Sequence, residues 1–496
     1  MSDFADMLQT LGTSRVCVLA GAGTLDGPGL RARALAVAEA LHRCDARIVA
    51  SQLDNGPDWL ALDLALRAHG LVHVPIPTFF SQAQVAHALG RSGADLLVTA
   101  DDGARHDDAA LLIAGLRARV LARSQAAPLP TGTACITFTS GTTGQPKGVC
   151  IDAPALLTVA GALAHASQPL APARHLCLMP LSTLLENISG LYGALLSGAD
   201  IAVPSLAEIG YSGAAGLDVA RLVACLHRYA PHSIILFPQL LLALVTTAEQ
   251  GIALPTSLRF VAVGGGRVGP ALLARAAALG LPVFEGYGLS ECVSVVALNR
   301  PGGMRPGSVG RPLPHAHVSV LDGELHVAGV RCLSYLGENA PPPGAIATGD
   351  LGHVDSDGFV HITGRRKHMF ITGFGRNVSP EWVESELLQH PLFAQAIVVG
   401  EARPFNVAVV WLRRPDADPG TVQRALDAIN AGLPDYARVS RIVRADRPFS
   451  STDGLLTDNG RPRRDAIARA YADAIAHAYH DASASPPSSP AQELPA

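Results

Sequence analysis

Lysine, charge and aromatic residues are all scarce in this chain of 496 residues. Only two of the 38 basic residues are lysines, Lys147 and Lys367, and charged residues make up 16% of the sequence. The formal net charge is −4, which does not favour a nucleic-acid or membrane-surface partner, because such proteins usually carry a concentrated basic patch. The arginine-rich, alanine-rich composition is typical of a GC-rich coding background, so the two remaining lysines are candidates for a specific role.

Paired cysteines and long apolar runs are also missing. The eight cysteines stand singly, with no C-x-x-C pair, so we expect neither a disulfide framework nor a zinc site, and a reduced cytoplasmic location fits. The first residues carry Asp3 and Asp6 and no basic stretch, which is unlike a secretory signal. The most apolar stretch, 233–248, contains Pro238 and Gln239 and falls short of the roughly 20 residues of a membrane span. We therefore expect no stable membrane insertion.

What the chain does contain is an alternation of strand-length apolar runs and amphipathic helical stretches. This pattern favours an α/β architecture. The spacing of apolar residues predicts helices over 29–43 and 59–69, and a buried strand running into a helix over 233–248. After about Gly323 the pattern changes to short extended segments separated by Gly and Asp turns, such as 359–363.

The length predicts more than one domain, because a single hydrophobic core rarely serves so long a chain. A basic, glycine-punctuated segment at 364–375 predicts a hinge. We expect a large multi-subdomain N-terminal α/β domain over 1–366, a smaller C-terminal α+β domain over 367–480 and a disordered Ser/Pro/Ala-rich tail over 481–496. In the smaller domain the patterns predict helices at 381–389 and 421–429 and strands at 394–399 and 407–412.

The strongest motif combines four hydroxyls, three glycines and a lysine within eleven residues. In order it reads Phe138, Thr139, Ser140, Gly141, Thr142, Thr143, Gly144, Gln145, Pro146, Lys147 and Gly148. Glycines let backbone N–H groups approach an anion, and the hydroxyls and the lysine supply further donors, so the motif predicts a phosphate-binding loop. Gly148 follows the lysine, so the spacing is not that of a P-loop NTPase. A flexible Ser/Thr/Gly linker is the alternative interpretation.

The string Thr139–Gly148 resembles the phosphate loop of the adenylate-forming superfamily, which includes acyl-CoA synthetases, nonribosomal adenylation domains and luciferases. Five further stretches resemble that family's motifs in the same order. They are Gly264-Gly265-Gly266, Tyr287-Gly288-Leu289-Ser290-Glu291, Thr348-Gly349-Asp350, Gly364-Arg365-Arg366-Lys367 and the segment 373–384. Together the motifs cover about residues 25 to 470 and imply an enzyme that uses ATP, Mg²⁺ and coenzyme A.

The resemblance also implies a role for each motif. Tyr287 packs on adenine, Glu291 holds Mg²⁺, Asp350 binds the ribose hydroxyls, Arg365 contacts ribose and phosphate, and the smaller domain is a mobile lid that rotates about Lys367. The implied nucleotide-binding set is Thr139, Ser140, Gly141, Thr142, Thr143, Gly144, Lys147, Gly264, Gly265, Gly266, Tyr287, Gly288, Ser290, Asp350, Arg365 and Lys367. Taken singly, Asp350 could be a turn residue, Glu291 a helix cap and Tyr287 a core residue.

One position departs from the family pattern. The family carries a catalytic lysine near the C-terminus, and the matching stretch here, 453–464, has Arg461 in its place. Arginine keeps the charge, but its planar fork differs from an ammonium. Three interpretations stay open. Arg461 supports full adenylation, or it impairs adenylation or restricts the enzyme to the thioester-forming step, or it belongs to a solvated basic face with Arg463 and Arg464. We count Arg461, Glu291 and Lys147 as the candidate catalytic residues.

The substrate is predicted from the stretch 179–187. Amino-acid-activating relatives place an aspartate there, whereas this chain has Thr183 and Leu184, so a plain acyl chain is favoured over an amino acid. Nearby apolar residues suit an alkyl tunnel or a core helix equally: Ile188, Leu191, Tyr192 and Leu195. Pro180 to Ser182 and Glu186 resemble long-chain fatty-acid–CoA ligases. We expect activation of a medium- or long-chain fatty acid and transfer to coenzyme A. The alternatives are transfer to an acyl carrier protein and a non-catalytic nucleotide-binding protein.

Overall fold

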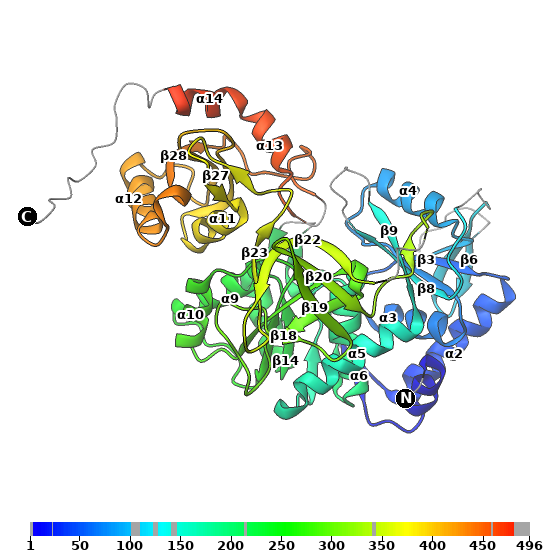
Figure 1. Cartoon of the computed structure of the whole chain (residues 1–496). Coiled ribbons are helices and arrows are strands. Elements are labelled where there is room, and N and C mark those ends of the chain that lie inside the picture. The colour runs from blue at the N-terminus through cyan, green and yellow to red at the C-terminus, as the bar shows by residue number, and fades with distance from the viewer. Residues whose placement is uncertain are drawn as a thin grey trace, which may run out of the picture. The chain divides into compact units, whose positions relative to one another are not determined.

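The computed structural model describes residues 3–21, 23–100, 110–122, 127–139, 146–212, 216–339, 344–457 and 460–480. The chain divides into two compact units, Met1–Ile362 and Thr363–Ala496 (Figure 1). The predicted boundary after residue 366 lies near this division and stays a prediction. The predicted disordered tail, 481–496, is outside the described residues.

The first large sheet of unit 1 has nine strands in the described part of the chain. Across the sheet they are β18 (Arg311–Pro312), β17 (Ser294–Leu298), β16 (Val283–Leu289), β15 (Phe260–Val263), β14 (Ser233–Leu236), β10 (Arg174–Leu176), β11 (Asp200–Ala202), β1 (Cys17–Ala20) and β2 (Gly23–Asp26). Strands β14, β15 and β16 run parallel, so their carboxyl ends meet at one edge. Helices α8 (Val219–Tyr229), α9 (Pro238–Glu249) and α10 (Pro270–Ala278) share a hydrophobic core with these strands. The predicted strand-into-helix over 233–248 is confirmed as β14 and α9.

The second large sheet has eight strands among the described residues. In order they are β21 (Ser334–Tyr335), β9 (Lys147–Asp152), β8 (Thr133–Thr139), β4 (Val72–Pro75), β3 (Ile48–Gln52), β5 (Leu96–Ala100), β7 (Leu116–Val120) and β6 (Ala110–Ile113). The predicted helices at 29–43 and 59–69 are confirmed as α2 (Gly27–Arg43) and α3 (Pro57–Ala68), which pack on each other. Both begin slightly earlier than predicted because each has a proline in its first turn, where the missing N–H costs nothing.

Helix α3 is buried on every side, and it carries a charged network into the core. Asp63 accepts from Arg67 Nε at 2.9 Å, contacts His73 Nδ1 at 2.5 Å and accepts from the Tyr192 hydroxyl. His73 Nε2 in turn lies 2.8 Å from Ser51 Oγ. Asp63, Arg67 and His73 are entirely inaccessible at their side chains, so this Ser–His–Asp arrangement serves packing and not catalysis. Burial of a charge requires such partners.

A smaller sheet follows towards the end of unit 1, with four strands among the described residues. Its strands are β19 (Ala316–Leu321), β20 (Glu324–Gly329), β22 (Ile346–Val354) and β23 (Val360–Arg365), which confirms the extended segments predicted after Gly323. Its inner face packs against Tyr287 and Val296 of the first large sheet.

Unit 2 contains a three-stranded sheet and flanking helices. The main described elements are β26 (Phe393–Val399), β27 (Asn406–Leu412), β28 (Val439–Arg444), α11 (Pro380–Gln389), α12 (Pro419–Asn430), α13 (Arg464–Ala470) and α14 (Ala472–His480), together with the short paired strands β24 (Phe370–Ile371) and β25 (Asn377–Val378). The two helices and two strands predicted for this region are confirmed, whereas β28, α13 and α14 were not predicted. Across the described residues of both units, no helix combines the length and apolar character that a membrane crossing requires.

Glu285 is a buried acidic residue in the middle of β16. Its residue is 9% exposed, and burial raises the pKa of its carboxyl to about 7, although Arg267 and the N–H of Val268 act in the opposite direction. Its neighbour along the strand, Tyr287, belongs to a predicted motif. The carboxyl is therefore easily protonated near neutral pH.

Replacing Asp63 with asparagine tests the buried network. The change leaves Arg67 charged in the core without its carboxylate, so the free energy of unfolding should fall by about 3–5 kcal/mol. Urea unfolding measures this loss. The control is Glu39→Gln, which removes the exposed partner of Arg43 and should change stability by less than about 1 kcal/mol. Equal stabilities of the two variants would contradict the assigned role.

Replacing Glu285 with glutamine tests the raised pKa. Because the folded pKa of about 7 exceeds the ordinary value of 4.5, the unfolded chain releases the proton first, and wild-type stability falls as pH rises between these values. At about 1.4 kcal/mol per pKa unit, the loss is on the order of 3 kcal/mol by pH 8. Glutamine does not titrate, so the unfolding free energy of Glu285→Gln minus that of wild type should increase by this amount between pH 5 and pH 8. Urea unfolding at the two pH values measures the difference. A difference independent of pH would rule the assignment out.

Candidate active site

The two ends of the predicted phosphate loop belong to the paired strands β8 and β9. Thr139 is the last residue of β8 and Lys147 the first of β9, and the two are paired in register. Thr139 Oγ1 donates to the Lys147 carbonyl oxygen at 3.4 Å. Ser140, Gly141, Thr142, Thr143 and Gly144 lie outside the described residues. The structure thus places the two ends of the loop side by side.

Lys147 reaches two side chains that sequence reasoning missed. Its Nζ lies 3.2 Å from Glu338 Oε1 and 4.9 Å from the centre of the Tyr335 ring. The lysine and the glutamate are both about half exposed. Tyr335 belongs to β21, which pairs with β9, so strand pairing brings the tyrosine beside the lysine.

Glu291 reaches the same tyrosine from another part of the chain. It lies in a 3-10 turn, η3 (Ser290–Cys292), directly after β16, and its Oε1 accepts a hydrogen bond from the Tyr335 hydroxyl. Burial, and then Glu291, raise the pKa of Tyr335, so the hydroxyl keeps its proton and donates. The structure therefore brings the predicted Lys147 and Glu291 together through Tyr335. No local pattern marks Tyr335, which is 44 residues from Glu291.

The chemistry of Glu291 fits a magnesium ligand. Mg²⁺ prefers carboxylate oxygens and usually keeps several waters and substrate phosphates in its shell. Glu291 is half-buried, and a carboxylate has more acceptor positions than the one that the Tyr335 hydroxyl uses. The nearby Lys147 would face the same phosphates. The assignment of Glu291 to Mg²⁺ stays a prediction.

Tyr287 and Asp350 meet across 63 positions of sequence. The Tyr287 hydroxyl donates to Asp350 Oδ2 at 2.6 Å, joining β16 to β22. The backbone N–H of Asp350 also donates to Thr348 Oγ1 at 3.1 Å, within the Thr-Gly-Asp motif itself. Asp350 is 4% exposed, so its carboxylate is held by the protein in this structure. Tyr287 and Glu291 are only four residues apart, so both pairs of predicted residues lie around the end of β16.

The predicted glycines that the structure describes lie at the same end of the sheet. Gly264 follows β15, and a Cβ there would meet the carbonyl oxygen of Gly286 at 3.3 Å, which places the turn beside β16. Gly265 has φ +76°, and a Cβ would meet the Phe237 ring at 2.8 Å, so only glycine fits. At Gly288 a Cβ would lie 1.6 Å from the Ser294 carbonyl oxygen, within a β-bulge. In parallel sheets, ligands bind outside the carboxyl ends of the strands.

Three predicted residues belong to unit 2. Arg365 ends β23, and its carbonyl accepts from the N–H groups of His368 and Met369, which forms the turn that contains the exposed Lys367. Arg461 is exposed, and its N–H donates to Thr457 Oγ1 at 3.0 Å. The roles predicted for these residues remain predictions.

The predicted substrate segment holds a π-helix, η2 (Glu186–Tyr192). Ile188, Leu191 and Tyr192 are fully buried members of the main hydrophobic core, which favours the core-helix interpretation over an alkyl tunnel at these side chains. Glu186 holds the first turn, since it contacts His175 Nε2 at 2.9 Å and accepts from the N–H of Met179 at 3.0 Å.

His175 and Glu186, with Cys177, form the one group of three potential metal ligands found among the described residues. Burial, and then Glu186, raise the pKa of the Cys177 thiol well above its usual range, so it stays protonated. His175 also contacts Ser233 Oγ at 3.0 Å. These hydrogen bonds indicate that the cluster has a structural role, in which it connects β10 to the first turn of η2.

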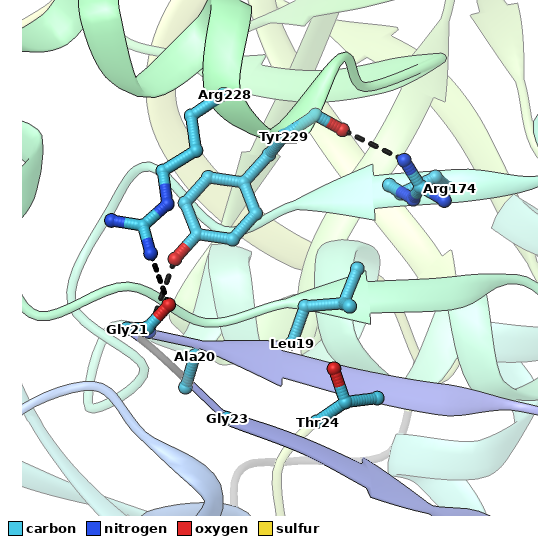
Figure 2. Close-up of a pocket in the computed structure, with 8 residues that line it drawn as sticks. All are labelled: Leu19, Ala20, Gly21, Gly23, Thr24, Arg174, Arg228 and Tyr229. Carbon is cyan, nitrogen blue, oxygen red and sulfur yellow. Dashed lines mark hydrogen bonds between the residues drawn. The ribbon is translucent and has the colours of Figure 1, made fainter.

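A hollow of about 230 Å³ lies at the turn between β1 and β2, away from the predicted motifs. Its lining residues are Leu19, Ala20, Gly21, Gly23, Thr24, Arg174, Arg228 and Tyr229. Figure 2 shows Arg228 and Tyr229 reaching Gly21 from one side and Arg174 bonding the Tyr229 carbonyl oxygen. The Tyr229 hydroxyl also donates to Glu208 Oε1 at 2.9 Å. None of the predicted nucleotide-binding residues lines this hollow.

Comparison with known proteins places most of the chain in one family. The family model described as AMP-binding enzyme matches residues 12–332, and that of the AMP-binding enzyme C-terminal domain matches residues 368–483. The chain is 29% identical to a long-chain-fatty-acid–CoA ligase, FadD15, of Mycobacterium bovis, over 84% of this chain and 85% of the relative. It is 30% identical to a sulfoacetate–CoA ligase of Cupriavidus necator, over 72% of this chain and 75% of the relative.

The fold has solved counterparts. One is o-succinylbenzoate coenzyme A synthetase, MenE, of Bacillus subtilis, in complex with ATP and a magnesium ion. It matches with a TM-score of 0.72 at 22% identity, over 94% of this chain and 99% of that one. This likeness confirms the predicted fold class, a large α/β domain with a smaller C-terminal domain. On the two family models and these relatives, the chain belongs to the AMP-binding enzyme family of the adenylate-forming superfamily and is an AMP-forming acid–thiol ligase.

Proposed function

We propose that this ligase activates a medium- or long-chain fatty acid with ATP and passes the acyl group to coenzyme A. The observation that carries the proposal is the joint contact of Lys147 and Glu291 with Tyr335, beside the Tyr287–Asp350 pair. A cation and a carboxylate at the carboxyl end of a sheet suit a magnesium-bound nucleotide.

In the first step, a carboxylate oxygen of the acid attacks the α-phosphorus of ATP, the bond to the β-phosphate breaks, and pyrophosphate leaves. A carboxylate is a weak nucleophile facing a polyanion, so the protein must align the reactants and offset charge. Lys147 and the loop hydroxyls would hold the departing β- and γ-phosphates. Asp350 and Arg365 would fix the ribose. Asp350 would then exchange the Tyr287 hydroxyl for ribose hydroxyls, and the freed Tyr287 ring would pack on adenine.

Glu291 is the residue that would hold Mg²⁺, which when bound would offset the negative charge of the phosphate oxygens. In the second step, the sulfur of coenzyme A attacks the acyl carbon, the bond between that carbon and the AMP oxygen breaks, and AMP leaves. The rotation of the smaller domain about Lys367, implied by the resemblance, belongs to this step. In the first step, Arg461 would pair with the carboxylate of the acid and with the α-phosphate.

The choice of a fatty acid, among carboxylic acids in general, is the more specific part of the proposal. Thr183 and Leu184 stand where an amino-acid-activating relative has an aspartate, so this position supplies no counter-ion for an amine. The Mycobacterium bovis relative is named for long-chain fatty acids, whereas the Cupriavidus relative is named for sulfoacetate. The relatives' names therefore support a carboxylic acid in general and a fatty acid in part.

Two alternatives remain. The acyl group could pass to the phosphopantetheine arm of a carrier protein, which has the same thiol chemistry. Arg461, in place of the family lysine, motivates the other: a protein that binds nucleotide without adenylation.

A pyrophosphate-exchange screen tests the proposed substrate. The acids run from butyrate to palmitate, with sulfoacetate, o-succinylbenzoate and an amino acid as comparisons. We expect exchange to be strongest with the medium or long alkyl acids, and the thioester to form on coenzyme A. Strongest exchange with a comparison acid would overturn the fatty-acid assignment. A thioester formed only on a carrier protein would overturn the acceptor, and ATP binding without exchange would favour the non-catalytic alternative.

Arg461 is tested by two substitutions. Arg461→Ala should slow pyrophosphate exchange by about 100-fold, because a charge aimed at the transition state is lost, whereas Arg461→Lys should stay within about tenfold of wild type. The control is Arg469→Ala, an exposed arginine of the following helix, α13. A large gain in rate for Arg461→Lys would show that the natural arginine impairs adenylation.

A further inference from the structure

The segment Cys332–Leu336 is fixed by backbone hydrogen bonds to two parts of the candidate site. The N–H groups of Leu333 and Leu336 donate to the carbonyls of Cys150 and Gly148, both at 2.8 Å, which ties the segment to β9. The N–H of Cys332 donates to the Glu291 carbonyl at 2.7 Å. Tyr335 therefore has a backbone position set by the strand that begins at Lys147 and by the turn that carries Glu291.

The Tyr335 side chain contacts both charged residues in different ways. Its hydroxyl donates to Glu291 Oε1, and its ring face receives the Lys147 ammonium at 4.9 Å. The hydroxyl fixes one oxygen of the carboxylate without neutralising its charge. The ring attracts the ammonium weakly and holds it on one side. A single half-buried tyrosine thus orients an anion and a cation that would face the same phosphates.

Glu338 completes the arrangement around Lys147. The two side chains are 49% and 52% exposed, so their ion pair at 3.2 Å is weak and readily exchanged. Glu338 can therefore release Lys147 to a phosphate, whereas the ring of Tyr335 keeps the ammonium near its place. Tyr335 is therefore the contact that would keep the Lys147 ammonium in position after Glu338 is displaced.

We propose that Tyr335 is a positioning residue, which orients Glu291 for the metal through its hydroxyl and Lys147 for the phosphates through its ring. The inference rests on the proposed nucleotide site and extends it to a residue that touches neither substrate nor reacting atoms. Outer residues that orient a metal ligand typically change metal affinity by about 10- to 100-fold when removed.

Tyr335→Phe separates the two contacts, because it keeps the ring and removes the hydroxyl. The Kd of Mn²⁺ is measured by electron paramagnetic resonance with α,β-methylene-ATP bound, so the readout does not depend on turnover. We expect this Kd to rise about tenfold, and the affinity for the analogue without metal to stay unchanged. The Mg²⁺ concentration for half-maximal pyrophosphate exchange should rise in parallel. In Tyr335→Leu, which also lacks the ring, metal-free binding of the analogue should weaken as well.

Tyr229→Phe is the matched control. The Tyr229 hydroxyl also donates to a glutamate, Glu208, and an arginine lies over its ring at 5.4 Å, but it lines the hollow at the β1–β2 turn. Its Mn²⁺ affinity should equal that of wild type. Thermal unfolding checks that each variant is folded. If Tyr335→Phe does not fold, Tyr335→Trp, which has a ring but no hydroxyl, is measured in its place with the same expectation.

Wild-type Mn²⁺ affinity in folded Tyr335→Phe or Tyr335→Trp would overturn the positioning role, as would an equal loss in Tyr229→Phe. A wild-type protein that exchanges no pyrophosphate with any acid would instead count against the proposed function alone, because the Mn²⁺ measurement requires no turnover.

Discussion

Strand β9 is held between two neighbours, and the candidate site depends on that pairing. On one side β8 returns the chain from Thr139 to Lys147, and on the other side β21 supplies Tyr335. A shift of one residue in either register would turn the side chains to the opposite face of the sheet. The pairing therefore determines that the phosphate-loop lysine meets the tyrosine that also bonds Glu291. The separate strand β16 leads into Glu291, so two sheets contribute to one small cluster of charge.

The charged groups of unit 1 divide into a rigid set and an exchangeable set. Asp63, Arg67 and His73 are sealed in the core, and Glu186 with His175 braces the start of the π-helix. These groups have protein partners on most sides and can do little except hold their elements in place. Lys147 and Glu338, in contrast, form a half-exposed pair that a polyanion can displace. We therefore expect substrate to bind at Lys147, because a phosphate can replace Glu338 as its partner.

Much of the fold could be predicted from local patterns, and the site only in part. Apolar spacing predicted α2 and α3, and the order of the motifs predicted Lys147, Tyr287, Glu291 and Asp350 as site residues. Tyr335 and Glu338 were missed because their role comes from the pairing of β21 with β9, and nothing in the sequence near residue 335 reports a partner strand almost two hundred positions away. The hydrogen bond between Tyr287 and Asp350 was not predicted for the same reason, because it joins two strands that are distant in the sequence. The apolar residues of the π-helix were ambiguous because a tunnel wall and a core helix require the same side chains.

The central claim is that one nucleotide lies at the end of β16, between the phosphate-loop hairpin and Asp350. A crystal structure of the protein with ATP and Mg²⁺ tests it most directly. The account predicts phosphates against Lys147, the metal on Glu291, adenine on Tyr287 and ribose at Asp350. Nucleotide bound elsewhere, for example in the hollow lined by Arg174 and Arg228, with Lys147 still paired to Glu338, would contradict it.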